Sequence, residues 1–343
     1  MSDSTQPSRA LGACGISVVI VSFNTREVLR ECLTALARES AGLRESAGLN
    51  VQTIVVDNGS KDGSVEMLRA EFPAVELIVS EENLGFGRAN NLAFERARGR
   101  YIVLLNSDAF LTPGSLRLSV QHMEADPKAG LGGGRLVGRD GSWQPSARRF
   151  PTLTTDVFVY SGLADRHARS RIFGSYNRTW ADPMQPAKVD WVPGAYSIIR
   201  AEALAAAQPF DPRFFLYFEE VDLCRRIKAA GYTIWYWPDV VVIHIGGESS
   251  RQLKTLQMSR VGAQLTLWRM RSTLLYYRKH HGLSSLGARF LEVAWNRFRA
   301  LRRSHSHDPE RRREAAYFHA QAELMEQAWK ETRGGRTSPR QPW

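Results

Sequence analysis

The sequence has little cysteine, no long apolar run and no leader-like start, and each absence disfavours a class of protein. Its 343 residues include three cysteines, scattered and without CxxC spacing, which argues against a disulfide framework or a structural zinc site. No stretch approaches the roughly 18 to 20 consecutive apolar residues that cross a bilayer. The opening MSDSTQPSRALGACG holds no apolar core of signal-peptide length. We therefore expect a protein of the reducing cytoplasm.

An excess of positive charge is missing from most of the chain, although the total is +11. Residues 1–250 contain 27 Lys and Arg against 28 Asp and Glu, a net of −1, and residues 251–343 contain 19 against 7, a net of +12. The apolar fraction of 43% and the charged fraction of 24% are those of a globular chain and exclude wholesale disorder. The sequence thus predicts a near-neutral body followed by a basic tail.

Apolar runs alternate with segments of helical spacing over the first third of the chain. This alternation predicts right-handed βαβ crossovers and hence an α/β fold with a mostly parallel sheet. The polar clusters SFN, DNGS and NSD lie where predicted strands end, so we expect them to converge on one ligand site at the carboxyl edge of the sheet. Strands and helices are predicted, alternately and in chain order, over 16–24, 25–39, 51–60, 64–72, 75–80, 87–99 and 100–111.

The later part of the chain has a less regular pattern. Residues 130–190 are rich in Gly, Pro, Arg and aromatic residues, which indicates loops and edge strands beside the site. A strand pair is predicted over 189–200, a helix over 219–231 and a strand over 233–247. The predicted organisation is a flexible N-terminus over 1–14, a catalytic domain over 15–250, a basic amphipathic helical extension over 251–332 and a disordered tail over 333–343.

Two common nucleotide-binding motifs are absent. The sequence has no GxxxxGK[ST], which excludes a P-loop. The GFG at 85–87 lacks the third glycine of a dinucleotide fingerprint and follows the third predicted strand rather than the first. A hydride-transfer enzyme is therefore poorly supported.

Seven motifs occur in one order: ISVVIVSFNTREVLRECL, VVDNGSKDGS, ENLGFGRANN, YIVLLNSDAFLTPGSL, VPGAYSIIR, FDPRFFLYFEEVDLCRRIKAAGY and VVIHIGGES. Together they resemble the inverting glycosyltransferase family 2, in its rhamnosyltransferase-like subgroup, over about residues 15–285. The resemblance implies a GT-A fold with a mostly parallel central sheet. It also implies a nucleotide-sugar donor and a divalent metal, Mg²⁺ or Mn²⁺.

The expected nucleotide pocket lies after the first two strands. Asp57 ends an apolar strand, where its carboxylate can accept hydrogen bonds from a base N–H or a ribose hydroxyl. The resemblance assigns it to the nucleotide, and an Asx-turn before the next helix is the alternative. Ser22, Phe23 and Asn24 would line the same pocket, unless they are ordinary polar residues at a strand end. The resemblance also places Gly85 at the nucleotide-sugar site.

The expected metal site centres on Asn106-Ser107-Asp108, which stands where many GT-A enzymes have Asp-x-Asp. Asp108 offers an oxygen ligand suited to a hard cation on the donor diphosphate, or is a plain turn residue. Asn106 offers only a neutral oxygen, and we place it with the nucleotide sugar. His244, followed by two glycines, is a second candidate ligand or a packed strand-end histidine.

Three acidic residues, Glu219, Glu220 and Asp222, are the candidates for the catalytic base. A single displacement needs one carboxylate to take the proton of the attacking hydroxyl, and crowded carboxylates have raised pKa values. Helical spacing puts Glu219 and Asp222 on one face, so periodicity does not identify the base. The resemblance points to Glu220. The alternative is a set of acidic residues that complements the helix dipole.

Other residues are weaker candidates for substrate contacts. Arg88 stands at the start of a predicted helix and would neutralise phosphate, and Arg148-Arg149 would do the same or form a solvated surface pair. Trp191 and Gly194 are candidates for contact with the sugar or the acceptor. Trp191 is equally explained as a core residue.

The basic tail interleaves aromatic residues with arginines, as in WRMR, YYRK and WNRFR. We interpret 251–332 as helices that bind an anionic membrane surface, and the alternative is a basic face that contacts only solvent. Nucleic acid is a disfavoured partner. The predicted function is transfer of a sugar, rhamnose being one option, from a dTDP- or UDP-sugar to a glycan or polyprenyl-linked acceptor in cell-envelope polysaccharide synthesis. The expected location is the inner face of the plasma membrane. The alternative is a non-catalytic nucleotide-sugar-binding or scaffold protein.

Overall fold

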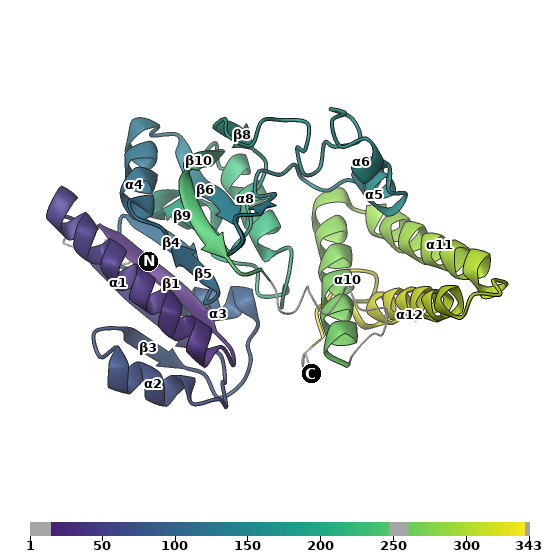
Figure 1. The fold of residues 1–343 in the computed structure, drawn as a ribbon, viewed down its shortest axis with the longest axis horizontal. Coiled ribbons are helices and arrows are strands. Elements are labelled where there is room, and N and C mark those ends of the chain that lie inside the picture. The colour runs from purple at the N-terminus through teal and green to yellow at the C-terminus, as the bar shows by residue number, and fades with distance from the viewer. Residues whose placement is uncertain (1–14, 247–259, 340–343) are drawn as a thin grey trace, which may run out of the picture.

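The computed structural model describes residues 15–246 and 260–339. In Figure 1 a sheet with helices on both faces occupies one side, and three long C-terminal helices occupy the other. No helix within those two ranges is long and apolar enough to cross a membrane. The predicted flexible N-terminus, 1–14, and the predicted domain boundary at 250 lie outside the described residues.

One mixed sheet contains the ten strands of the described residues, in the order β3-β2-β1-β4-β9-β6-β10-β5, with β7 beside β6 and β8 beside β10. The strands are β1 (Ile16–Ser22), β2 (Val51–Asp57), β3 (Glu76–Val79), β4 (Tyr101–Leu105), β5 (Ala109–Leu111), β6 (Ala129–Val137), β7 (Trp143–Gln144), β8 (Ala187–Val189), β9 (Tyr196–Arg200) and β10 (Thr233–His244). Their interior residues are mostly β-branched and apolar, as expected of strands covered on both faces.

The strand directions bring the polar strand ends together. β1 runs parallel to β2 and β4, and Ser22 pairs with Asp57 in the β1–β2 register. β9 is antiparallel to β4 and to β6, and β10 is parallel to β6, so β10 points the same way as β1. The carboxyl ends of β1, β2, β4 and β10 therefore share one edge. The predicted convergence of the strand ends is confirmed.

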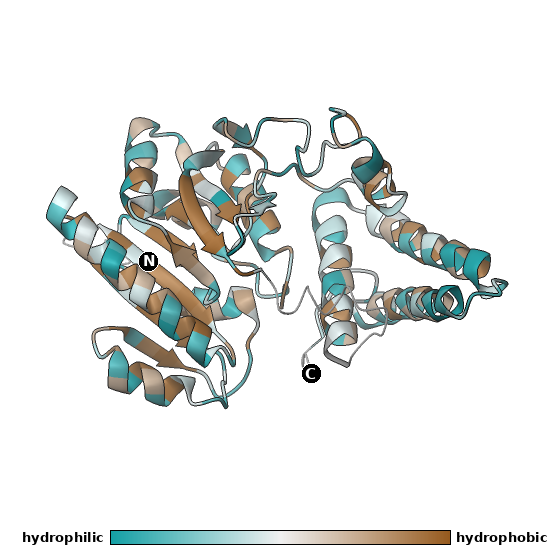
Figure 2. Ribbon diagram, in the orientation of Figure 1, coloured by the Kyte–Doolittle hydropathy of each residue, from teal (hydrophilic) through white to brown (hydrophobic). Residues whose placement is uncertain are grey.

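Two groups of helices cover the sheet, and Figure 2 shows the brown, apolar strands between them. Buried side chains of α1, α2 and α4 pack on one face, and those of α3, α7 and α8 on the other. The helices are α1 (Arg26–Ala47), α2 (Ser64–Glu71), α3 (Phe86–Phe94), α4 (Ser115–Ala125), α5 (Leu153–Tyr160), α6 (Leu163–Arg166), α7 (Ala201–Ala207), α8 (Glu219–Ala229), α10 (Arg260–His281), α11 (Ser284–Ser304) and α12 (Pro309–Glu331).

Helix α10 belongs to the core of the body. Tyr276 and Tyr277 are buried in the same apolar cluster as α3 and α8, and Trp268 is buried against Phe215 with ring centroids 4.4 Å apart. The sequence interpretation placed these aromatic residues on a basic, membrane-facing surface, which is wrong for all three because the body covers them. The predicted extension is thus joined to the body through α10, and α11 and α12 pack on α10.

Two further predictions need correction. Residues 129–137 were expected as loops or edge strands but form the central strand β6. Its four glycines, Gly130 and 132–134, weaken the sequence signal, yet Gly132 is required because a Cβ there would lie 1.9 Å from the Trp237 ring. The tail was expected to be disordered from residue 333, but Gly334 and Gly335, with φ of +70° and +83°, fold it back onto Trp329 and Leu274.

If α10 is part of the core, Trp268→Ala should lower the free energy of unfolding by about 3–5 kcal/mol, the usual cost of deleting a buried aromatic side chain. Phe290→Ala on α11 is the matched control, because its ring is exposed and its loss should change stability by about 0.5 kcal/mol or less. Urea unfolding followed by circular dichroism measures both. Equal stabilities of the two variants would show that α10 is not part of the core.

Candidate active site

Asp57 forms the first part of the site, at the end of β2. Its side chain is buried, and Oδ1 accepts a hydrogen bond of 3.0 Å from the backbone N–H of Ser60. Oδ2 is buried and has no hydrogen-bond partner among the described residues. A buried acceptor without a donor is costly, and the N–H or hydroxyl of a ligand would remove that cost. Asp57 therefore has an oxygen for each of the two predicted roles: Oδ1 forms the turn contact, and Oδ2 is available to a ligand.

The loop after β1 lies beside Asp57. Asn24 has a φ of +52°, and its Oδ1 accepts a hydrogen bond of 2.8 Å from the N–H of Lys61, so it ties this loop to the loop after β2. Ser22 is buried, with its hydroxyl 3.0 Å from that of Thr25. Phe23 leaves its ring 40% exposed at the same edge, where an aromatic face can stack on a base. Phe23 and Asn24 are therefore exposed at this edge, whereas Ser22 is buried.

Asp108 and His244 meet where β5 and β10 pair. His244 Nε2 lies 3.4 Å from Asp108 Oδ1. Gln144 Nε2 donates to the carbonyl of His244 at 2.8 Å, which turns Gln144 Oε1 toward His244 Nδ1 at 2.9 Å. Nδ1 therefore carries a proton that Gln144 accepts, and Nε2 is the ring nitrogen that faces the carboxylate. Sequence analysis missed Gln144 because nothing in the local pattern links it to a histidine 100 positions later.

This pair fits a cation that is shared with a phosphate. No group of three or more His, Cys, Asp and Glu side chains in the described ranges would hold a metal by itself. Mg²⁺ and Mn²⁺ commonly bind through one or two protein ligands plus substrate phosphates, and an outer partner such as Gln144 fixes the ligating histidine. Asn106 contributes its backbone: its carbonyl accepts from Ala109 N–H at 3.0 Å and closes the turn before Asp108.

Glu219 and Glu220 open α8 and form a buried carboxyl pair. The Oε2 atom of each is buried without a hydrogen-bond partner in the part of the chain that the structure describes. Burial raises the pKa of Glu219 well above its usual range, and the charge of Glu220 raises it further. Burial also raises the pKa of Glu220, while the nearby charge of Arg148 works in the opposite direction. One proton is thus readily retained by the pair.

A chain of contacts links this pair to the metal-site turn. A Cβ on Gly194 would lie 4.0 Å from Cβ of Glu220 and 3.3 Å from the ring of Phe86. The next residue, Ala195, accepts a hydrogen bond of 3.0 Å from the backbone N–H of Asn106. Glu220 and the turn that contains Asp108 therefore lie on either side of Gly194 and Ala195. Gly194 lies between Phe86 and Glu220, and its contact with the sugar or the acceptor stays a prediction.

The turn before the glutamates is held in an unfavourable conformation. Tyr217 and Phe218 have φ values of +70° and +68°, in the left-handed region that costs non-glycine residues free energy. α10 supports this turn: Ser272 Oγ donates to the carbonyl of Leu216 at 2.8 Å, and the rings of Phe218 and Tyr276 pack with centroids 5.3 Å apart. The position of both glutamates thus depends on α10.

Asp222 has a different role from the two glutamates. It is fully buried, and Arg226 donates to its Oδ2 at 2.8 Å while Lys279 and His280 lie 2.6 and 2.7 Å from its Oδ1. Burial alone would raise the pKa of Asp222, but these partners hold it below its usual value. Because its oxygens are engaged by basic side chains, we reassign Asp222 from proton transfer to anchoring α8 on α10.

The remaining candidates are mostly structural. Trp191 is buried, donates from Nε1 to the carbonyl of Arg149 at 2.8 Å and stacks under Arg148, so its core alternative is favoured. Arg88 donates to the carbonyl of Pro212 at 2.7 Å. Gly85 has a φ of +80° and leaves no space for a side chain, since a Cβ would lie 2.2 Å from the carbonyl oxygen of Phe215.

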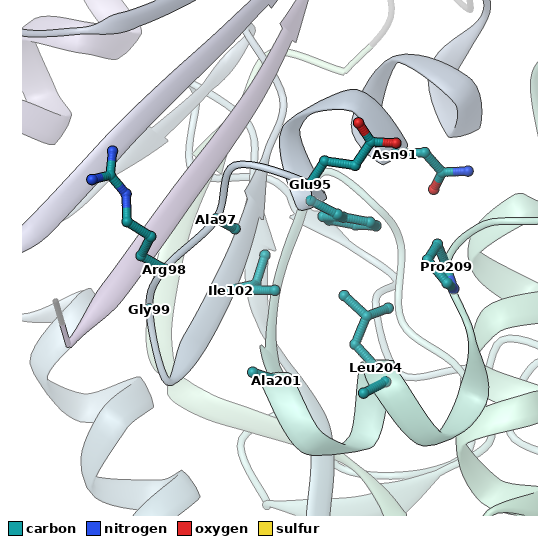
Figure 3. Close-up of a pocket in the computed structure, with 11 residues that line it drawn as sticks. Asn91, Glu95, Ala97, Arg98, Gly99, Ile102, Ala201, Leu204 and Pro209 are labelled. Atoms are coloured by element: carbon teal, nitrogen blue, oxygen red, sulfur yellow. The ribbon is translucent and has the colours of Figure 1, made fainter. Parts of the chain in front are cut away.

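Figure 3 shows a cavity of about 380 Å³ between α3, β4 and α7, lined by apolar side chains including Ile102 and Leu204. It contains none of the predicted site residues. Gly99 and Ile102 belong to the amino end of β4, so the cavity lies at the edge of the sheet opposite Asp57 and Asp108. This cavity is separate from the candidate active site.

Two family models match this chain: residues 17–181 match Glycosyl transferase family 2, and residues 101–298 match Glycosyl transferase family group 2. The N-acetylglucosaminyl-diphospho-decaprenol L-rhamnosyltransferase of Mycobacterium tuberculosis (strain H37Rv) is 30% identical over 220 residues, which cover 61% of this chain and 71% of that protein. Rhamnosyltransferase WbbL of Escherichia coli (strain K12) is 26% identical over 280 residues, which cover 79% of this chain and 95% of WbbL.

A solved structure shares the fold. It is the mannosyltransferase PcManGT from Pyrobaculum calidifontis in complex with GDP-Man and Mn²⁺. Its TM-score is 0.53 at 17% identity, and the match covers 90% of this chain and 86% of that chain. The GT-A fold predicted from the sequence is confirmed.

The anchoring role of Asp222 predicts a pH-dependent contribution to stability. Because folding lowers the pKa of Asp222 from an ordinary value near 3.9, its stabilising effect is complete above that pH and is lost as the pH falls through the folded pKa. Asp222→Asn should therefore cost about 3 kcal/mol at pH 7, because the partly buried Arg226 and Lys279 lose the carboxylate that they share. The difference should shrink as the pH falls below about 4. Urea unfolding across pH 3–8 measures it, and a difference that does not change with pH would contradict the assignment.

Proposed function

The chain belongs to glycosyltransferase family 2, and on that premise we propose that it is an inverting enzyme that moves a sugar from a nucleotide-sugar donor to a glycan acceptor. The observation that supports this most directly is the adjacent Glu219 and Glu220 beside the Asp108 turn, each with a buried Oε2 atom that has no hydrogen-bond partner among the described residues. An inverting transfer needs a proton acceptor next to the place where the donor diphosphate is held, and these two groups meet that need.

The donor would span the carboxyl edge of the sheet. The free oxygen of Asp57 would accept a hydrogen bond from the base or ribose, and Phe23 would stack on the base. Asp108 and His244 would hold a divalent cation, Mg²⁺ or Mn²⁺, on the diphosphate. When bound, such a cation neutralises the negative charge that develops on the departing nucleoside diphosphate.

Glu220 is the proposed base. Glu220 is half-buried, whereas Glu219 is buried, so Glu220 is the more accessible of the two residues to an acceptor hydroxyl. The charge of Arg148 favours the ionised form of Glu220, so the proton that the pair retains would reside on Glu219. Glu220 would then take the proton of the acceptor hydroxyl as its oxygen attacks the anomeric carbon, and the nucleoside diphosphate would leave from the opposite side.

The relatives suggest the identity of the two substrates. The mycobacterial relative is named for L-rhamnose transfer to an N-acetylglucosaminyl-diphospho-decaprenol acceptor, and the Escherichia coli relative is also named a rhamnosyltransferase. By analogy we propose a dTDP-rhamnose donor and a polyprenyl-diphosphate-linked glycan acceptor, in the synthesis of a cell-envelope polysaccharide. Such an acceptor would bring the enzyme to the cytoplasmic face of the membrane.

Glu220→Gln should lower kcat by about 10²–10⁴-fold, the usual contribution of a general base, and leave the affinity for dTDP-rhamnose within about twofold of wild type. Glu219→Gln is the matched control: glutamine mimics a protonated glutamic acid, so the loss should stay within about tenfold. Rate measurements on a lipid-linked acceptor and calorimetry with the donor separate the two effects. If Glu219→Gln abolished turnover while Glu220→Gln did not, Glu219 would be the base. Donor binding without turnover in wild type would indicate a binding protein.

The contact between Gln144 and His244 predicts that a change at Gln144 weakens metal binding, although Gln144 is not itself a proposed metal ligand. Gln144→Leu removes the acceptor that orients His244, so the Mn²⁺ concentration for half-maximal donor binding should rise about 10–100-fold. Trp143→Leu on the same strand is the control and should leave it unchanged. Titration of Mn²⁺ into EDTA-treated protein with dTDP-rhamnose, followed by calorimetry, measures both. Donor binding that needs no divalent cation would contradict the metal assignment.

A further inference from the structure

One face of α11 exposes large apolar side chains. Counting 3.6 residues per turn, these side chains fall within an arc of about 120° that extends for about 27 Å along the helix. Their exposed fractions range from 45% to 73%. A row of exposed apolar side chains on one helix face is a candidate interaction site. The exposed α11 face consists of Leu283, Leu286, Phe290, Phe298 and Leu301.

The opposite side of α11 is packed against the rest of the protein. Ala288 and Val293 are buried there, and Glu292 accepts hydrogen bonds from Arg269 at 2.6 Å and from Tyr160 at 3.0 Å. At the start of the helix, Gly287 also packs on α5, since a Cβ there would lie 2.7 Å from Leu153. The helix is therefore held in place, and its apolar face remains outward without any need to fold on binding.

The segment that contains the exposed α11 face carries an excess of positive charge, although Arg289 and Arg303 of α11 pair with Glu326 and Glu314 of α12. Residues 283–313 contain eight arginines and three acidic residues, a net of +5. The single acidic residue of α11 is the buried Glu292, while Arg297 and Arg302 are exposed beside the apolar side chains. In Figure 1, α11 lies at the far side of the molecule from the β1–β3 edge of the sheet. The apolar side chains and the arginines thus form one outward surface.

We propose that the exposed α11 face docks the enzyme on the surface of an anionic lipid bilayer. The apolar side chains enter the boundary between headgroups and acyl chains, and the arginines contact anionic headgroups, which are the two signals that stable peripheral binding needs. A second copy of the chain fits less well, because pairing two such faces would bring arginines against arginines. This docking rests on the proposed function, because it would bring the enzyme to a lipid-linked acceptor in the membrane.

This assignment replaces the broader sequence interpretation of the tail. The aromatic residues of α10 are buried in the body, and α12 buries Phe318 and Met325. The membrane surface predicted for the whole of 251–332 is thereby reduced to α11 and the arginines next to it.

The test uses full-length protein and vesicles that contain neither donor nor acceptor. Wild type should co-sediment with phosphatidylcholine vesicles containing about one-third phosphatidylglycerol and should bind pure phosphatidylcholine at least about tenfold more weakly. Phe290→Glu with Leu301→Glu should lower binding to the anionic vesicles by at least about tenfold. Val79→Glu is the matched control, since Val79 is an exposed apolar residue on β3, and it should bind like wild type.

A second variant separates charge from apolar contact. Arg297→Ser with Arg302→Ser should weaken binding to the anionic vesicles about tenfold and should reduce the effect of added salt. If the Phe290→Glu, Leu301→Glu variant has a lower melting temperature than wild type, the Phe290→Ser, Leu301→Ser variant is used in its place. Failure of the wild-type protein to co-sediment with anionic vesicles would overturn the proposal. Sedimentation that shows a dimer dissociated by the Phe290 and Leu301 changes also overturns it and assigns this face to a second copy. Donor calorimetry is independent, so failure of donor binding would count against the proposed function and not against docking.

Discussion

The packing of α10 against the 215–218 turn is the interaction on which the candidate site depends. The turn contains two non-glycine residues with positive φ, and such a conformation persists only where its surroundings impose it. Trp268, Ser272 and Tyr276 provide those surroundings. Below the turn, Asp222 ties α8 to Lys279 and His280 at the end of α10. The C-terminal helices therefore hold the proposed catalytic carboxylates in place.

The same contact explains why the three acidic residues of EEVD (219–222) differ in their surroundings. The three carboxylates lie within four positions of one helix, yet both oxygens of Asp222 are engaged by basic side chains, whereas one oxygen each of Glu219 and Glu220 is buried without a hydrogen-bond partner among the described residues. A buried carboxyl group that lacks partners has a raised pKa, as a general base requires, whereas a carboxylate paired with cations has a lowered pKa. Neighbouring residues thus acquire opposite protonation behaviour because of the elements that face them.

The sequence predicted the strand-end residues well and the later contacts poorly. Asp57 and Asp108 stand out because they end apolar runs, and parallel strands bring their carboxyl ends to one edge. The glycines of β6 hid a central strand, since their space is taken by Trp237 and other side chains distant in sequence. Helical periodicity could not separate Asp222 from Glu220, because the distinction comes from basic side chains 57 and 58 positions later. Gln144 had no local signal either.

The central claim is a single displacement at the carboxyl edge of the sheet, with Glu220 as the base, and the stereochemistry of the product tests it most directly. Purified enzyme, Mn²⁺, dTDP-rhamnose and a polyprenyl-diphosphate-linked N-acetylglucosamine acceptor would be combined, and the new glycosidic bond examined by NMR. The account predicts an anomeric configuration inverted relative to the donor. A product with retained configuration would contradict the single displacement.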